Sequence, residues 1–179
     1  MKRAARDELK PLLGDDSIGL EGRSSLGDHH SLRLWLRLLS CSNDIETQIR
    51  QRLRSRFGMT LARFDYLAQL HRHPGGLRMN ALSRYLMVTG GNVTGLTDEL
   101  EKDGLVARED DPDDRRSYRV SLTARGRKAF EKIASVHEGW VVELLGGVTE
   151  ADRQQLFDLL GRLRVRLSAQ QAAVTAEDA

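Results

Sequence analysis

Apolar residues recur every three or four positions from about residue 28 to residue 55, as they do along one face of an amphipathic helix. The repeating positions are Leu34, Leu38, Cys41, Ile45, Ile49 and Leu53. At about 1.5 Å per residue, this helix would be about 40 Å long, which is more than a small globule can cover. We therefore expect a dimerisation helix that packs against a second copy of the chain.

Shorter helical patterns follow, and four of them are preceded by a threonine that can cap a helix. Thr60 precedes the first, which ends before Pro74, and a short helix is expected at 79–86. Thr89 stands before a helix over 90–103 with an apolar stripe of Val93, Leu96 and Leu100. Thr123 and Thr149 each precede a further helix, and the second of these is expected to end at Leu167.

Two short strands, 105–108 and 118–122, are expected between these helices. The turn at 109–117 is so polar that we expect all of it to be exposed. A short helix, a tight turn, a second helix and a ribbon with a charged tip form a winged helix-turn-helix. The predicted fold is mainly α with a small β-wing and with N- and C-terminal dimerisation helices. Its parts are a mobile N-terminal arm (1–27), a helical dimerisation region (28–58 and 124–168), a DNA-binding lobe (59–123) and a frayed tail (169–179).

Composition narrows the class of protein. The 179 residues carry a net charge of +2, 30% charged side chains and a single cysteine. No apolar run approaches the roughly 18 residues that a membrane span needs, and the first residues lack the apolar core of a secretory signal. One cysteine cannot form a disulfide within the chain. These features favour a cytoplasmic protein without a membrane partner.

Small and polar residues gather on one face of the 90–103 helix, as a helix that enters the major groove of DNA requires. With the preceding cap, the candidate contacts are Thr89, Gly90, Gly91, Asn92, Thr94, Gly95 and Thr97. Arg115 or Arg116 at the ribbon tip can reach a minor groove, and Asp113 or Asp114 can hold such an arginine in place. The alternatives are a loosened first helical turn and an ordinary hairpin with solvated charges.

Four segments resemble the MarR family of bacterial transcriptional regulators: LMVTGGNVT at 86–94, LEKDGLV at 100–106, DRRS at 114–117 and VSLT at 120–123. The resemblance covers about residues 30–168. It implies a homodimer that binds a pseudo-palindromic operator in double-stranded DNA and is released by a small aromatic or anionic ligand. It also implies that the recognition helix starts at Thr89 and that Arg116 is the wing arginine, with Asp114 as its partner.

A narrower resemblance involves RFGMTL at 56–61 and HEGW at 137–140. These segments are similar to members that govern catabolism of hydroxycinnamates and related aromatic acids, which implies an aromatic carboxylate or its coenzyme A thioester as effector. The residues expected to bind it are Arg33, Trp35, Arg37, His137 and Trp140, with the arginines at 50–56 as further cations. The alternative for both tryptophans is hydrophobic packing at the dimer interface.

Other chemistry is not expected. Cys41 lies on the apolar stripe and is interpreted as structural, and no histidine has partners at the spacing of a metal site. No nucleophile with a base and no pair of carboxylates indicates an enzyme, and no cofactor is predicted. The alternative function is a winged-helix module that binds protein instead of DNA.

Overall fold

The computed structural model describes residues 30–86, 90–111 and 114–177, with the side chains of 114–116 and 174–177 left aside. Its elements, in chain order, are α3 (His30–Phe57), α4 (Leu61–Arg72), β1 (Leu77–Arg78), α5 (Met79–Leu86), α6 (Gly90–Lys102), β2 (Val106–Asp111), β3 (Asp114–Leu122), α7 (Ala124–Leu144) and α8 (Glu150–Glu177). The arm predicted at 1–27 and the cap predicted at Thr89 lie outside the described residues.

Three predicted threonine caps are confirmed. The backbone N–H of Arg63 donates to the Thr60 hydroxyl over 3.3 Å, and that of Gly126 donates to Thr123 over 2.9 Å. Thr149 accepts from the N–H of Asp152 at 3.2 Å and donates to its carboxylate at 2.6 Å. Each cap satisfies a backbone donor that has no partner within its helix, so the local sequence fixes where α4, α7 and α8 begin.

The three strands form an antiparallel sheet in the order β1-β3-β2. Strand β1 was not predicted, because two residues are too few to show a period; it pairs Leu77 with Val120 and Arg78 with Arg119. Strands β2 and β3 extend further toward the tip than the expected 105–108 and 118–122. Backbone pairing continues there because charged side chains at a ribbon end can face solvent without disturbing the ladder.

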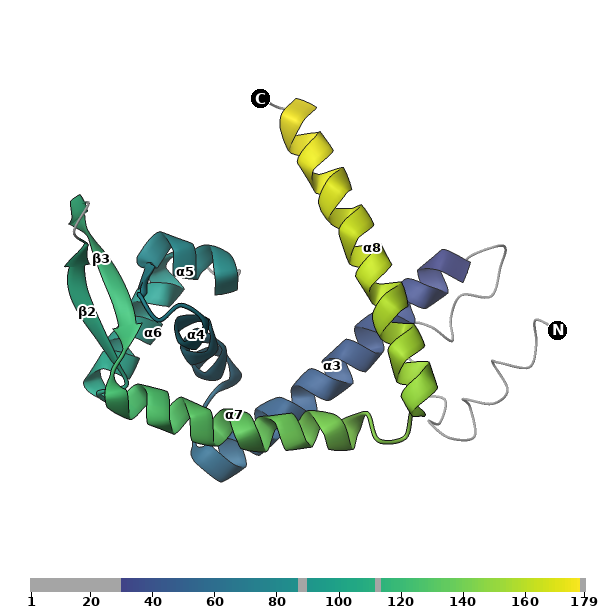
Figure 1. Ribbon diagram of the computed structural model, residues 1–179, viewed down its shortest axis with the longest axis horizontal. Helices are drawn as coiled ribbons and strands as arrows, with labels where there is room; N and C mark the ends of the chain where they lie inside the picture. The colour runs from purple at the N-terminus through teal and green to yellow at the C-terminus, as the bar shows by residue number, and fades with distance from the viewer. Residues whose placement is uncertain (1–29, 87–89, 112–113, 178–179) are drawn as a thin grey trace.

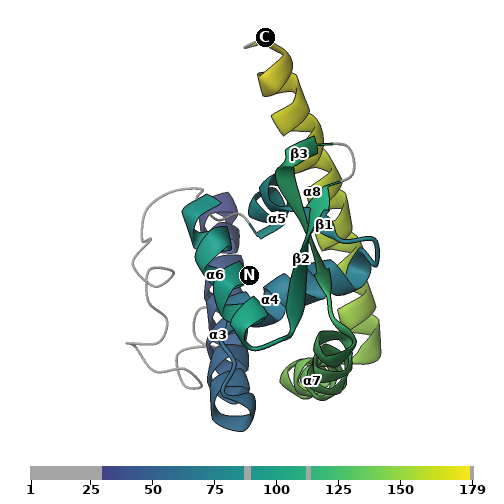
Figure 2. The ribbon, with the colours of Figure 1, turned by 90° about the vertical axis from the view of Figure 1, so that its left-hand side faces the viewer.

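The core lies between α4, α5, α6, α7 and the sheet (Figures 1 and 2). Among the described residues, the fully buried apolar side chains come from α4, α5, α6, β3 and the C-terminal part of α3: Leu53, Tyr66, Leu67, Leu70, Leu82, Val93, Leu100 and Val120. Helix α7 adds Phe130, whose ring centroid lies 5.5 Å from that of Phe64. Figure 2, in which the wing faces the viewer, shows α6 beside the β2–β3 ribbon.

Helices α3 and α8 extend away from this core (Figure 1). Only Ile49 and Leu53 of α3 are buried, whereas large apolar side chains along most of α8 are exposed. The prediction of a frayed tail from residue 169 was wrong, since α8 continues to Glu177. Its last turns are rich in alanine and glutamine, which favour helix. No helix within the described ranges is long and apolar enough to cross a membrane.

Candidate nucleic-acid interface

Helix α6 has one exposed and one buried face. Val93 and Leu100 are fully buried against the core. The exposed face carries the small and polar residues predicted for it: Gly90, Gly91, Asn92, Thr94 and Gly95. An added Cβ at any of the three glycines would meet no atom of the protein, so the glycines leave this face open. The helix therefore offers Asn92 and Thr94 to a partner that can approach the backbone closely.

Thr97 was predicted to contact DNA, and this prediction is wrong. The side chain is fully buried, because residue 97 lies one turn from both Val93 and Leu100 and shares their face. Its hydroxyl lies 2.5 Å from the Tyr66 hydroxyl and donates to the Val93 carbonyl over 2.6 Å. Burial raises the pKa of Tyr66 above its usual value. Thr97 thus fastens α6 to α4 from the inside.

Ion pairs fasten α6 from two further sides. Arg108 of β2 donates to Glu101 over 2.9 Å and also pairs with Asp98, so the ribbon is tied to the helix. Arg63 of α4 pairs with Asp103 just beyond the end of α6. These contacts fix the position of α6 relative to the ribbon. Two elements that contact the same DNA duplex need such a fixed relative position.

The ribbon carries the predicted wing residues at the start of β3. Asp114, Arg115 and Arg116 are its first three residues, and their side chains lie outside the described part. The expectation that the whole polar turn is exposed was wrong at one position, because Asp111 is only 1% exposed. Sequence reasoning missed Asp111, since nothing in a run of acidic residues marks the one that faces inward.

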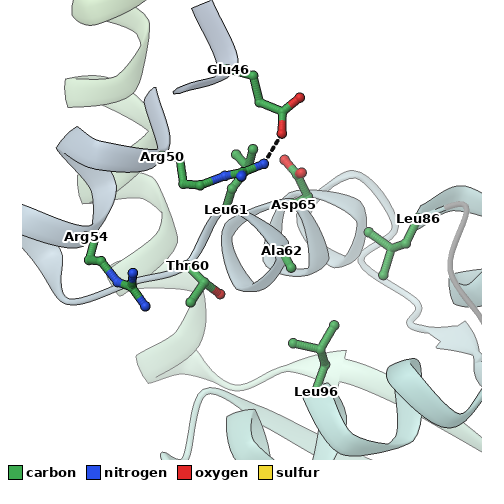
Figure 3. A pocket seen from close by; sticks show the side chains of 9 residues that line it. All are labelled: Glu46, Arg50, Arg54, Thr60, Leu61, Ala62, Asp65, Leu86 and Leu96. Atoms are coloured by element: carbon green, nitrogen blue, oxygen red, sulfur yellow. Dashed lines mark hydrogen bonds and ion pairs between the residues drawn. The ribbon is translucent and has the colours of Figure 1, made fainter. Parts of the chain in front are cut away.

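A cavity of about 350 Å³ separates α3 from the helix-turn-helix (Figure 3). Arg50 and Arg54 of α3 lie on one side, and Leu86 and Leu96, from α5 and α6, lie on the other. Arg50 pairs with Glu46, whereas Arg54 forms no ion pair with any described residue. Asp65 of α4 also faces this cavity, and burial, helped by the charge of Glu46, raises the pKa of its carboxyl. The site thus combines a free guanidinium with apolar walls.

A second, mostly apolar cavity of about 1200 Å³ lies between α3 and α8. Arg37, Cys41 and His137 line it, and burial lowers the pKa of His137. Two of the predicted ligand residues, Arg37 and His137, therefore meet at one cavity; Arg33 and Trp35 line neither cavity, and Trp35 is 58% exposed on α3.

Trp140 was predicted to contact a ligand, with packing at the dimer interface as the alternative, and the structure places it in the interior of the protomer. The side chain is buried within its own protomer, with its ring centroid 6.1 Å from that of Phe57. The guanidinium of Arg52 lies 6.0 Å from the same ring. Trp140 thus forms neither a wall of a described cavity nor an exposed dimer contact, because α7 turns it toward the end of α3.

The arrangement of α5, α6 and the β2–β3 ribbon defines a winged helix-turn-helix, and known proteins share it. A model of the MarR family matches residues 57–117. The transcriptional activatory protein BadR of Rhodopseudomonas palustris is 36% identical over 104 residues, which cover 57% of this chain and 59% of BadR. The chain spans little more than half the length of the curated relatives that it matches first.

Solved structures extend the similarity over nearly whole chains. A MarR family transcriptional regulator from Silicibacter pomeroyi is 34% identical, with a TM-score of 0.65 over 79% of this chain and 96% of that one. MepR from S. aureus in complex with DNA is 26% identical, with a TM-score of 0.62 over 75% and 96%. The chain belongs to the MarR family of transcriptional regulators. This agrees with the resemblance seen in the sequence, and members of this family are transcription regulators, not enzymes.

Proposed function

We propose that this protein is a cytoplasmic, homodimeric repressor that binds a pseudo-palindromic operator and leaves it when an aromatic acid or its coenzyme A thioester binds. The observation that carries the DNA-binding part is the exposed face of α6. Asn92 and Thr94 face outward beside open glycines, while Val93, Thr97 and Leu100 anchor the opposite face. A helix that enters the major groove needs this division of faces.

The wing supplies the second contact with DNA in this proposal. Arg115 and Arg116 follow Asp114 at the start of β3, and Arg108 ties the same ribbon to α6. A guanidinium is favoured by the negative potential of a narrow minor groove. Arg116 is proposed to enter that groove, with Asp114 holding its guanidinium and Arg115 contacting the backbone nearby.

The exposed apolar surface of α3 and α8 supports the homodimer. Leu34 and Trp35 of α3 are 51% and 58% exposed, and Phe157 of α8 is 73% exposed. Monomeric proteins rarely leave so much contiguous apolar surface in water. A second copy that covers both helices would place two α6 helices on one side of the dimer. We expect them to meet successive major grooves about 34 Å apart.

The 350 Å³ cavity supports an aromatic acid as effector. Its size lies at the lower end of small-molecule sites, which suits a single-ring compound. Arg54 can pair with the carboxylate, and the apolar walls can cover the ring. A coenzyme A thioester requires the larger cavity beside Arg37 and His137. Because Leu96 belongs to α6, a ligand in the smaller cavity would touch the recognition helix directly.

Selection of bound sequences from random duplexes tests the DNA-binding proposal. We expect two inverted half-sites about one helical turn apart. Asn92→Ala is expected to relax base preference within each half-site. Asn43→Ala makes the same change on the exposed surface of α3 and serves as the control. Failure to enrich any sequence would contradict the proposal and favour the alternative, a winged-helix module that binds protein.

Titration of ligands into the protein–operator complex tests the effector. Release by single-ring aromatic acids, reduced in Arg54→Gln, would place the effector in the smaller cavity. Release by thioesters only, reduced in Arg37→Gln, would place it in the larger one. A ligand-linked change of about 5–150-fold in operator affinity is the usual range for such coupling. Transcription from an operator-bearing promoter, with and without the protein, decides between repression and activation.

A further inference from the structure

One acidic residue of the wing is buried. Asp111 ends β2 and is 1% exposed, although its neighbours Glu109 and Asp110 are exposed. The register between β2 and β3 is irregular between Asp110 and Asp111, because three extra residues of β3 lie between their partners Tyr118 and Asp114. Such an irregularity increases the local twist of the ribbon. At this point, just before the wing tip, the Asp111 carboxylate is buried in the protein.

Two arginines among the described side chains contact this carboxylate. Arg78 of β1 donates from Nε to Oδ2 over 2.7 Å and from Nη2 to Oδ1 over 2.8 Å. Arg119 of β3 donates from Nη2 to Oδ2 over 3.3 Å. Arg78 and Arg119 are direct partners across β1 and β3, so their like charges would repel without an anion between them. Asp111 therefore joins all three strands through charge-assisted hydrogen bonds.

Arg119 extends the cluster to the turn before β1. Its Nη1 lies 3.4 Å from the Gly75 carbonyl and 3.5 Å from the Gly76 carbonyl. Gly76 has a φ of +74°, and an added Cβ would lie 2.7 Å from the Val120 carbonyl oxygen. Only glycine permits this close approach. Since α5 begins directly after Arg78, the cluster connects the wing to the first helix of the helix-turn-helix.

We infer that Asp111 is a positioning residue for DNA recognition: clamped by Arg78 and Arg119, it sets the direction in which the wing leaves the sheet toward the minor groove. The inference rests on the proposed DNA-binding function. Asp111 is the Cα partner of Asp114, which directly precedes Arg115 and Arg116. A change in the twist at Asp111 therefore moves the start of the strand that carries both wing arginines, while Asn92 on α6 keeps its own anchors.

The test separates readout by the wing from readout by α6. Positions on the selected operator that wild type protects and Arg116→Ala does not are first located by hydroxyl-radical footprinting. Two operators are then made with identical half-site cores, one with A·T pairs and one with G·C pairs at those positions. Wild type is expected to prefer the A·T operator, because A-tracts narrow the minor groove and attract arginine.

Asp111→Asn removes the charge and keeps the shape. We expect about a tenfold loss of affinity for the A·T operator, the size of losing one arginine contact, with a much smaller loss for the G·C operator. Asp110→Asn removes the same charge from an exposed side chain one residue away from Asp111. This variant is expected to keep the wild-type preference for the A·T operator. Arg78→Lys keeps the charge but loses the bidentate hydrogen bond to Asp111. It is therefore also expected to reduce the preference for the A·T operator.

The possible outcomes separate a role of Asp111 in DNA recognition from a role in stability alone. Unchanged preference for A·T in both Asp111→Asn and Arg78→Lys would overturn the inference while leaving DNA binding intact. Equal losses on both operators, matched by a loss of folded protein in circular dichroism, would assign Asp111 to stability alone and would also overturn it. Failure of wild type to bind either operator would instead refute the proposed function itself. If Asp111→Asn does not fold, Arg78→Lys provides the same comparison.

Discussion

The Tyr66 and Thr97 hydroxyls form a buried hydrogen bond, and removing one or the other is expected to change the free energy of unfolding by different amounts. Thr97→Val removes the hydroxyl and leaves the Tyr66 hydroxyl buried without its 2.5 Å partner. An unsatisfied buried polar group costs about 1–3 kcal/mol of unfolding free energy. Tyr66→Phe leaves Thr97 bonded to the Val93 carbonyl, so it is expected to cost only about 0.5–1.5 kcal/mol, the net value of one hydrogen bond.

The double variant tests the reasoning directly. With both hydroxyls gone, no buried group lacks a partner, so the double variant is expected to lose less stability than the sum of the two single losses. Urea denaturation at one fixed protein concentration measures all four proteins, because the proposed dimer would make stability depend on concentration. Thr94→Val makes the same change on the exposed face of α6 and is expected to stay within about 0.5 kcal/mol of wild type. Additive losses, or a Thr97→Val cost no larger than that of Tyr66→Phe, would refute the assignment.

Three further predictions concern packing, pH and salt. In Gly126→Ala, the new Cβ would lie 1.8 Å from the Leu105 carbonyl oxygen, so we expect a loss of at least about 1–3 kcal/mol in denaturation, whereas Gly139→Ala, with open space around it, is expected to be neutral or stabilising. Burial lowers the pKa of His137, so the unfolded chain binds a proton at this residue more tightly than the folded protein does. Stability is therefore expected to fall as pH drops below about 6.5. Between pH 7.5 and 5.5, wild type is expected to lose more unfolding free energy than His137→Gln. If the dimer neutralises about eight phosphates, the logarithm of operator affinity is expected to fall with that of salt at a slope near −7, and a slope near zero in filter binding would contradict phosphate contact.

The sequence predicted the order of the elements because their start signals are local. A threonine cap depends on a residue and the next few N–H groups, so Thr60, Thr123 and Thr149 could be identified without knowledge of the fold. The apolar stripe of α6 was also visible, and Val93 and Leu100 lie where it placed them. Helical spacing alone places residue 97 on the same face as Val93 and Leu100, and only the polar side chain of Thr97 suggested the exposed face.

The errors at Asp111 and Trp140 have a different origin. Asp111 is buried where Arg78, distant in sequence, and Arg119 of the neighbouring strand meet its carboxylate next to the register shift. Trp140 is buried because the end of α3 crosses α7 and brings Phe57 to its ring. Neither contact leaves a trace in local composition. Partners supplied by tertiary structure decide such positions, and a single sequence does not contain them in readable form.

The contacts around α6 have a consequence for regulation. Thr97 ties α6 to α4, Arg108 ties it to the wing, and Asp111 ties the wing to β1 and the start of α5. A displacement of any one of these elements is expected to move the others, because each of these contacts is a directional hydrogen bond or ion pair with a buried or half-buried partner. Leu86 and Leu96 face the cavity that separates this unit from α3. A ligand there would therefore shift the recognition helix and the wing together relative to α3. In the proposed dimer, such a shift would change the distance between the two α6 helices, and the proposed contact with successive major grooves depends on that distance.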